Sequence, residues 1–302
     1  VGACSLYANT TGTRNTASGF YAMLANTTGS NNTAYGGRAL ASNTTAHNNT
    51  ASGYSSLRAN TTGNSNTASG YYSLGKNTTG SNNTGVGFRA LCSNTTGRNS
   101  AFGNVALCTN TTGTLNTGLG DHALFANTTG CNNTASGYAA LRANTTGCRN
   151  TASGAYALCK NTTGCFNVGT GSGALEDNTT GIRNTAHGMW SLANNTTGDK
   201  NTADGMYALF DNTTGCYNTA SGYATLPNST TGKCNTAYGA YAMYTTTTGC
   251  DNVALGKQTL FYNTTGCHNT ATGYKALYCN TTANNNTALG YQALKENTTG
   301  NY

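Results

Sequence analysis

Charge, proline and long apolar segments are scarce in this sequence. Only 8% of its 302 residues are charged, against about 25% in ordinary globular proteins, which is too few for a disordered polyelectrolyte. Hydrophobic residues make up 36%, below the usual content of about 45% or more, so one large apolar core is excluded. No run approaches the ~18 apolar residues of a membrane span, and we expect no such span. The chain holds 40 glycines and a single proline, Pro227.

The few charges are scattered singly along the chain. The formal net charge is +7, from 15 Lys and Arg residues and 8 Asp and Glu residues. The cations form no basic run and no arginine-rich helix; examples are Arg14, Arg38, Arg58, Lys76 and Arg89. The sequence therefore predicts no nucleic-acid partner.

Residue types that carry catalysis or metal binding are dispersed as well. The eight acidic residues are spread over the chain, and Gly-x-Gly segments such as residues 85–87 lack the strand–turn–helix context of a nucleotide loop. No C-x-x-C pair that would favour zinc is present. We therefore expect no enzyme activity, no cofactor and no metal site. The four histidines occupy different positions of the repeat described next: His47, His122, His187 and His268.

An internal repeat organises the whole chain. The tetrad Asn-Thr-Thr-Gly or a near copy starts at 18 places, and every step is 17 residues except one of 16 between Asn94 and Asn110. The consensus is N-T-T-G-x-x-N-T-A-x-G-Y-x-A-L-x-x, and 17 complete units fill a single array over residues 1–302. A helical hairpin repeat needs about 33 residues, and Gly, Asn and Thr are poor in helix interiors.

The period predicts an all-β fold, a parallel β-solenoid with 17 residues per coil and about 17 coils. Each coil would carry two or three short strands, and neighbouring coils would lie ~4.8 Å apart. The alternative, a disordered low-complexity tract, is disfavoured by the regular spacing of Leu, Gly and Asn.

The fixed residues of the repeat suit such a coil. Glycine supplies positive φ at the corners, while Leu and Ala form a narrow core in which each coil covers its neighbours. The second Asn of the unit is expected to stack on its equivalents and to hydrogen-bond along the solenoid, as Asn ladders do in cross-β assemblies. Members of this structural Asn ladder include Asn15, Asn32, Asn49, Asn66, Asn83, Asn116 and Asn133.

The repeat also carries a family resemblance. The stretch Asn133-Thr-Ala-Ser-Gly-Tyr-Ala-Ala-Leu141 resembles the repeats of YadA-like heads of trimeric autotransporter adhesins, and more closely the NTAxGYxAL repeats of bacterial and phage tail-fibre-like proteins. The family signature S-V-A-I-G-x-x-A aligns with N-T-A-S-G-Y-A-A here. The resemblance implies a left-handed parallel β-roll, an extracellular or cell-surface location, and an adhesive or fibre-forming function. The expected partners are further copies of the chain, and surface glycans or a host surface.

A structural extracellular fibre or adhesin stalk, self-assembling into filaments or trimers, is the leading functional hypothesis. The partial repeats at residues 1–6 and 297–302 are expected to stack on further copies, because an uncapped solenoid end exposes strand edges. The alternative is an ice-binding β-solenoid with Thr arrays that match ordered water. Adjacent Thr residues of a tetrad would point to opposite faces, however, so a flat two-column T-x-T face is missing.

Each tetrad Asn spells an N-glycosylation sequon, as at Asn9, Asn26, Asn60 and Asn77. These residues are candidate glycan sites; the alternative is a turn ladder that merely spells the sequon. Stacked sequons would lie only ~4.8 Å apart, which is too close for branched glycans on every coil. Further sequons start at Asn31, Asn48, Asn82, Asn132, Asn194, Asn228 and Asn285.

Twelve cysteines are candidates for disulfides between neighbouring coils, with small buried filler as the alternative. Equivalent positions on adjacent coils place two Cα atoms ~4.8 Å apart, inside the window that a disulfide needs. This favours Cys92–Cys108 and Cys250–Cys267. Disulfides would imply an oxidising compartment.

Five more cysteines are weaker disulfide candidates. Cys216–Cys234 is one residue out of register. The remaining three fall on successive coils, so only one pair forms among them: Cys131, Cys148 and Cys165.

Tyrosine, with 19 residues, mostly follows the fixed glycine, as at Tyr54, Tyr71 and Tyr138. An aromatic ladder that covers neighbouring coils is favoured over a glycan-binding stripe, since the column is interrupted.

Overall fold

The computed structural model describes residues 2–301, which are all-β without a helix. The chain divides into two compact units, unit 1 (Val1–Arg149) and unit 2 (Asn150–Tyr302). The division falls within one repeat, and no change of the sequence motif accompanies it. Val1 and Tyr302, which belong to the two partial repeats, lie outside the described residues.

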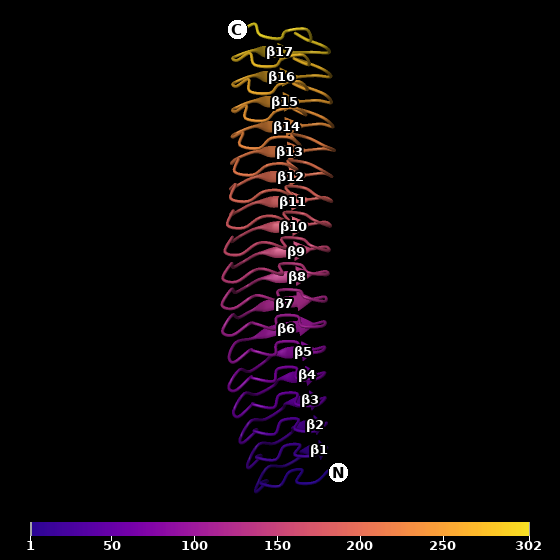
Figure 1. Cartoon of the computed structure of the whole chain (residues 1–302), viewed down its shortest axis with the longest axis vertical. Helices are drawn as coiled ribbons and strands as arrows, with labels where there is room; N and C mark the ends of the chain where they lie inside the picture. Colours follow the sequence, from indigo (N-terminus) through magenta and orange to yellow (C-terminus); the bar gives the residue numbers. More distant parts are fainter. Residues whose placement is uncertain (1, 302) are drawn as a thin grey trace. The chain divides into compact units, whose positions relative to one another are not determined.

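Unit 1 contains eight short strands, each paired in parallel with the next in chain order (Figure 1). The register places equivalent residues of successive repeats side by side, for example Ala17 beside Ala34. The strands are β1 (Thr16–Ser18), β2 (Thr33–Tyr35), β3 (Thr50–Ser52), β4 (Thr67–Ser69), β5 (Thr84–Val86), β6 (Asn99–Phe102), β7 (Asn116–Leu119) and β8 (Thr134–Ser136).

Unit 2 contains nine strands in the same parallel, in-register arrangement. They are β9 (Thr151–Ser153), β10 (Val168–Thr170), β11 (Thr185–His187), β12 (Thr202–Asp204), β13 (Thr219–Ser221), β14 (Thr236–Tyr238), β15 (Val253–Leu255), β16 (Thr270–Thr272) and β17 (Thr287–Leu289). The predicted parallel β-solenoid with one coil per repeat is therefore confirmed.

The expectation of two or three strands per coil is wrong, because each described coil carries one strand of three or four residues. Numbering the consensus 1 to 17, left-handed φ values recur at non-glycine positions 6, 13 and 15, as at Asn31 (φ 59°), Arg38 (φ 61°) and Leu40 (φ 50°). A left-handed residue cannot extend a strand. These turns still bond to the neighbouring coil; the Leu40 N–H donates to the Ser56 carbonyl at 3.0 Å.

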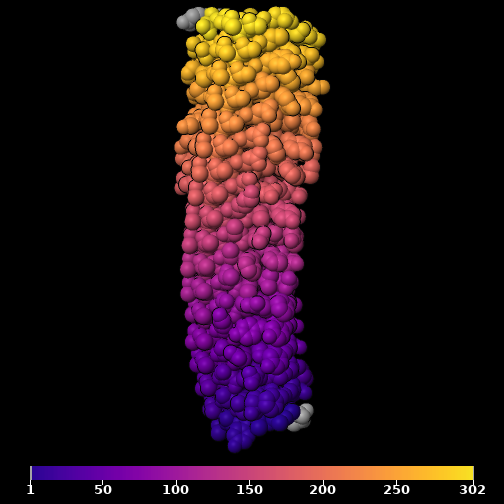
Figure 2. Space-filling model, viewed as in Figure 1, coloured from indigo at the N-terminus to yellow at the C-terminus, as the bar shows by residue number. Residues whose placement is uncertain are grey.

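The core of each unit is narrow and is made by positions 9, 14 and 15. Ala34, Ala39 and Leu40 are completely buried. The strand sequence Thr-Ala-x alternates across the sheet, so Ala faces inward while its two neighbours face outward. On the face shown in Figure 2, the atoms of successive coils within either unit are closely packed. The predicted Leu and Ala core is thereby confirmed.

The glycine at position 11 is fixed by backbone contact between coils. Gly53 has φ 130°, and a Cβ on it would lie 2.6 Å from the carbonyl oxygen and 2.7 Å from the carbonyl carbon of Gly70. Real Cβ atoms do not approach backbone so closely, and this φ is accessible almost only to glycine.

Two ladders of buried Asn side chains run from coil to coil. At position 7, the Asn32 N–H donates to Asn15 Oδ1 at 3.0 Å, and Asn32 Nδ2 donates to the Ala46 carbonyl at 2.8 Å. The other candidate ladder residues repeat the backbone N–H to Oδ1 bond or accept it; they are Asn49, Asn66, Asn83, Asn116 and Asn133. The second ladder is formed at position 1 by the tetrad Asn, where Asn60 Nδ2 donates to Asn43 Oδ1 at 3.0 Å.

Candidate functional site: a basic and aromatic face of unit 1

Long side chains at positions 12, 13, 16 and 17 of the repeat are exposed or partly exposed, and in unit 1 these positions hold several cations and aromatic rings. We call this surface the basic face and define it by Tyr21, Arg38, Arg58, Tyr71, Tyr72, Lys76, Phe88 and Arg89. It spans five consecutive coils of unit 1. The basic face is not visible as a run of basic residues in the sequence, because its cations are 13 to 20 residues apart.

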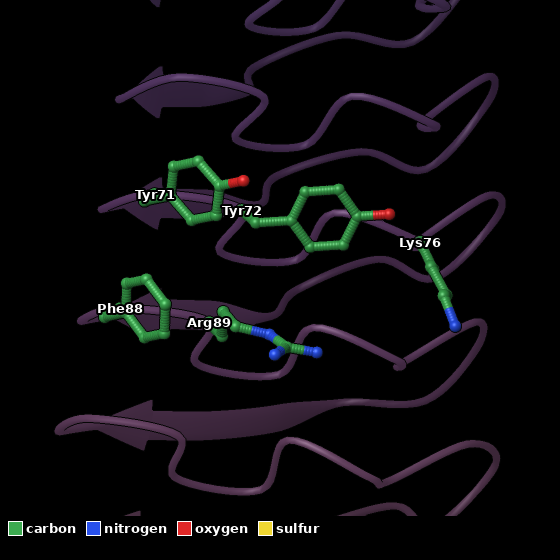
Figure 3. Close-up of a pocket in the computed structure, with 5 residues that line it drawn as sticks. All are labelled: Tyr71, Tyr72, Lys76, Phe88 and Arg89. Atoms are coloured by element: carbon green, nitrogen blue, oxygen red, sulfur yellow. The ribbon is translucent and has the colours of Figure 1, made fainter.

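A cavity of about 400 Å³ lies in the basic face between Tyr71, Tyr72, Lys76, Phe88 and Arg89. Figure 3 shows Tyr71 and Phe88 on neighbouring coils, and the Tyr72 hydroxyl extending toward the Lys76 side of the opening. Cavities of this size accommodate small ligands. A second cavity of about 290 Å³ is lined by Tyr21, Leu24, Arg38, Ala41, Ser42, Arg58 and Ala59.

The position 12 aromatic side chains stack on one another. The Tyr54 and Tyr71 ring centroids are 5.8 Å apart with 10° between the planes, and those of Tyr71 and Phe88 are 5.4 Å apart with 12°. This is the offset stacking that aromatic pairs prefer. The rings thus cover one another's faces and present their edges outward, as the predicted aromatic ladder requires.

Tyr72 lies down across its own coil because the residue three positions later is Gly75. A Cβ on Gly75 would lie 2.6 Å from two carbons of the Tyr72 ring, so a side chain there would displace the ring. The Arg58 Cζ atom lies 5.8 Å from the Tyr72 ring centroid, within the range of a cation–π interaction. Tyr72 lines the first cavity and Arg58 the second, so this contact lies between residues of the two cavities.

Electrostatically, unit 1 is almost purely cationic. Residues 1–149 contain eight Lys and Arg residues and one acidic residue, Asp121, a net charge of +7. The Asp121 carboxylate accepts a hydrogen bond from Asn104 Nδ2 at 3.2 Å and lies 2.5 Å from His122 Nδ1. The Asp121 carboxylate therefore interacts with Asn104 and His122, and not with the cations of the basic face.

The corresponding surface of unit 2 is aromatic but neutral. Residues 150–302 contain seven Lys and Arg residues and seven Asp and Glu residues. Lys160 Nζ lies 2.8 Å from Asp177 Oδ1, and this hydrogen bond raises the pKa of Lys160. A cavity of about 420 Å³ is lined by Tyr207, Phe210, Asp211, Tyr223, Ala224, Pro227, Asn228, Tyr241 and Tyr244.

Two of the predicted cysteine pairs lie at equivalent positions of adjacent coils. A disulfide joins Cys92 to Cys108, with the Cα atoms 4.9 Å apart. Cys250 and Cys267 are thiols whose Sγ atoms lie 2.8 Å apart. Their hydrogen bond, together with burial, raises the pKa of Cys250 to about 12. The Cys250–Cys267 disulfide therefore stays a prediction, with its two sulfurs adjacent.

Among the weaker candidates, Cys131 and Cys148 have Sγ atoms 3.0 Å apart in unit 1, while Cys165 belongs to unit 2 and donates to the Thr163 carbonyl at 3.4 Å. The suggested Cys216–Cys234 pair is not formed. Cys216 Sγ donates to the Thr214 carbonyl at 3.3 Å, and the exposed Cys234 occupies the following, left-handed position of its coil.

The tetrad Asn side chains, which are the candidate glycan sites, are turned inward in the folded chain. The side chains of Asn26, Asn60 and Asn77 are completely buried. Each Nδ2, including that of Asn9, donates to a backbone carbonyl three residues later, so the atom that would carry a glycan is engaged. Position 6 holds the exposed sequon residues instead: Asn31, Asn48, Asn82, Asn132 and Asn285.

Threonine columns differ between the strand and the tetrad. At position 2 the hydroxyl donates to the next coil, as Thr27 Oγ1 does to the Thr44 carbonyl at 3.1 Å. On the strands, Thr at position 8 faces outward beside a mixed position 10 that holds Ser52, Val86 and Phe102 among others. A regular two-column Thr face is therefore not formed by the strands of the described residues.

The histidines and carboxylates stay dispersed in space. Within residues 2–301, no group of three or more His, Cys, Asp and Glu side chains is placed to hold a metal ion. No helix in this part of the chain is long and apolar enough to cross a membrane. Comparison with known proteins gives no match, neither to a protein-family model nor to a curated protein.

Proposed function

We propose that this chain is a structural protein of an extracellular fibre or adhesin stalk, built from stacked 17-residue coils that assemble with further copies into filaments or trimers. The stacked repeats fit a structural repeat protein. Beyond this fit, we propose an extracellular location, assembly with further copies and a load-bearing function.

The observation that carries the proposal is that the polar bonds of each unit run between coils. Asn60 Nδ2 donates to Asn43 Oδ1 at 3.0 Å, and Asn49 Nδ2 donates to the Gly63 carbonyl at 2.9 Å. At this junction between two coils these side-chain bonds act in parallel with backbone bonds such as that from the Leu57 N–H to the Ser73 carbonyl, so several hydrogen bonds bear a force along the stacking direction, and the same set recurs at the other junctions. Such redundancy suits a mechanical element better than a site for chemistry.

The resemblance of residues 133–141 to autotransporter-head and tail-fibre repeats supports the same function, together with self-association and contact with surface glycans or a host surface. The Cys92–Cys108 disulfide supports an oxidising, extracellular setting. The mixed second column beside the strand Thr residues gives no comparable support to the ice-binding alternative, for which thermal hysteresis of the purified chain is the direct measurement.

Assembly of the purified 302-residue chain tests the proposal. We expect electron microscopy to show filaments or trimers, and analytical ultracentrifugation to show association that increases with concentration. A chain that sediments as a stable, soluble monomer at high concentration would contradict the proposed function.

A further inference from the structure

We propose that unit 1 binds a linear acidic polysaccharide, a polymer of uronic acid or sulfated sugars, along the basic face. The proposal is independent of the fibre function, because it requires only folded unit 1, whether the chain is single or assembled.

The cations of the basic face are spaced along the stacking direction. Four successive coils contribute one each, namely Arg38, Arg58, Lys76 and Arg89. Neighbouring coils are separated by 4.9 Å, measured between the Cα atoms of Cys92 and Cys108. This step is close to the length of one sugar ring, so a polymer that runs along the stacking direction passes one cation per coil, at positions 13, 16, 17 and 13 of the repeat. A compact anion would reach only one or two of them.

These four cations are available to a ligand. Among the residues that the structure describes, none of the four forms an ion pair with a carboxylate. The one acidic residue of unit 1, Asp121, is engaged by Asn104 and His122. Arg38, Lys76 and Arg89 are exposed. Uncompensated cations on one surface attract polyanions and accelerate their binding.

The cavity beside these cations suits a sugar. The Tyr71 and Tyr72 side chains supply phenolic hydroxyls, which donate and accept hydrogen bonds, and their ring edges supply apolar contact for the carbon side of a sugar. Lys76 and Arg89 line the same cavity and place positive charge beside it. Ligand sites typically combine an apolar surface with a small number of polar groups that point toward the ligand.

The ring geometry favours a polysaccharide over single-stranded nucleic acid. Nucleic-acid channels bind bases by stacking them on exposed aromatic faces. In the basic face, the position 12 rings are stacked on one another at 5.8 and 5.4 Å, so their faces are already covered. A base would have to separate this stack, whereas a sugar contacts ring edges and hydroxyls without disturbing it.

Binding of polygalacturonate, a linear carboxylated polysaccharide, to the full chain tests the proposal. Calorimetric titration at about 50 mM salt limits the screening of surface charges. The test variant is Arg58→Gln/Lys76→Gln/Arg89→Gln. The matched control, Arg14→Gln/Arg98→Gln/Arg149→Gln, removes the same charge from exposed residues at positions 5 and 6 of the repeat in the same unit. Circular dichroism and thermal unfolding check that both variants keep the fold.

We expect the test variant to bind polygalacturonate at least ~10-fold more weakly and the control to stay within ~2-fold of the natural chain, since direct contacts outweigh net charge at close range. Equal losses in both variants would reduce the effect to net charge and overturn the site. Absence of polygalacturonate binding would overturn it as well. Tighter binding of oligothymidylate, abolished by the test variant alone, would keep the surface but overturn the ligand class.

Discussion

Units 1 and 2 are built from the same coil but differ in charge and in one of their buried ladders. Unit 1 carries a net charge of +7, while unit 2 carries equal numbers of cations and anions. The tetrad Asn ladder is unbroken through unit 1 from Asn9 to Asn144. In unit 2, Ser229 and Thr246 replace two of its members. The outward positions thus vary freely, while the inward ones vary only at a cost.

That cost is visible at the interruption of the ladder. Asn212 Oδ1, Ser229 Oγ and Thr246 Oγ1 are buried and have no hydrogen-bond partner. A buried polar atom without a partner costs about 1–3 kcal/mol. Unit 2 keeps the same coil across these positions, which shows that neighbouring ladders and the Leu and Ala core compensate for a local loss.

The largest expected effect concerns the glycine that the two units share at position 11. Gly53→Ala in unit 1 and Gly239→Ala in unit 2 should each lower the free energy of unfolding by about 4 kcal/mol, because two costs add. The alanine would have to adopt a positive φ of 130° or 120° that only glycine tolerates, and its Cβ would clash with the backbone of the next coil. A Cβ on Gly239 would lie 2.7 Å from the Gly256 carbonyl carbon. Urea unfolding followed by circular dichroism measures both.

Gly290→Ala is the matched control for these substitutions. Gly290 has φ 125° but no atom within 4 Å of an added Cβ, so only the conformational cost of about 2 kcal/mol remains. An equally large loss in Gly290→Ala would mean that φ alone, and not contact between coils, fixes this glycine.

The next largest effect is the loss of stability on reduction, which we expect in unit 1 because it contains the Cys92–Cys108 disulfide. Reduction of the Cys92–Cys108 bond, which closes a sequence separation of 16 residues, should destabilise unit 1 by about 3 kcal/mol. Hydrogen exchange resolved by peptide reports each unit separately, and Cys92→Ala/Cys108→Ala should remove the effect of the reductant on unit 1. Non-reducing peptide mapping should recover the Cys92–Cys108 link; finding both as thiols in oxidised material would refute it. The same map decides the predicted Cys250–Cys267 pair.

Breaking the tetrad ladder in unit 1 should lower the stability of that unit, and repairing it in unit 2 should raise the stability of that unit. Asn60→Ser in unit 1 removes the donor to Asn43 Oδ1 and should cost about 2 kcal/mol. Ser229→Asn/Thr246→Asn in unit 2 restores the missing partners and should stabilise that unit by about 2 kcal/mol. Thermal and urea unfolding of both variants provide the measurement.

Placing Asn at an exposed position serves as the control for the repair. Ser65→Asn adds the same side chain at position 6, which is exposed, and should leave stability within ~0.5 kcal/mol. If Ser229→Asn/Thr246→Asn were no more stable than the natural chain, the orphaned atoms would not account for the difference between the units.

The smallest expected effect is a pH dependence in unit 2 under reducing conditions. The pKa of Cys250 is raised to about 12, mainly by the hydrogen bond with Cys267. Between the usual thiol pKa and this value, the unfolded chain binds fewer protons than the folded chain, so the free energy of unfolding falls as pH rises. The contribution is fully present below about pH 8.5 and is lost toward pH 12.

Comparison with Cys250→Ala isolates this contribution from the titration of other groups. The variant should lose stability less steeply over the same alkaline range, as measured by urea midpoints at each pH. Parallel pH profiles for the variant and the natural chain would show that the thiol pair is not coupled to folding.

Much of the fold follows from the sequence, because comparison of the repeats with one another shows which positions must keep the same residue. The period predicted the parallel stacking, and the fixed second Asn predicted the ladder that Asn15 and Asn32 form. At the tetrad Asn the structure shows the alternative to a glycan site, a turn ladder that merely spells the sequon. The sequon suggests an exposed side chain, whereas Asn60 turns its amide inward to the Gly63 carbonyl and the Asn ladder. The basic face was missed because its cations are separated in sequence and meet only through coiling.

The sequence by itself determined the length of the coil, its stacking on equivalent residues and the identity of the Leu and Ala core, since a strict period leaves in-register pairing as the way to bury the same residues in every repeat. Only the tertiary structure decided which way each repeated side chain points. Left-handed residues at positions 6, 13 and 15 rotate the backbone between strands. This rotation buries the tetrad Asn, exposes position 6 and brings Arg58, Lys76 and Arg89 onto one surface.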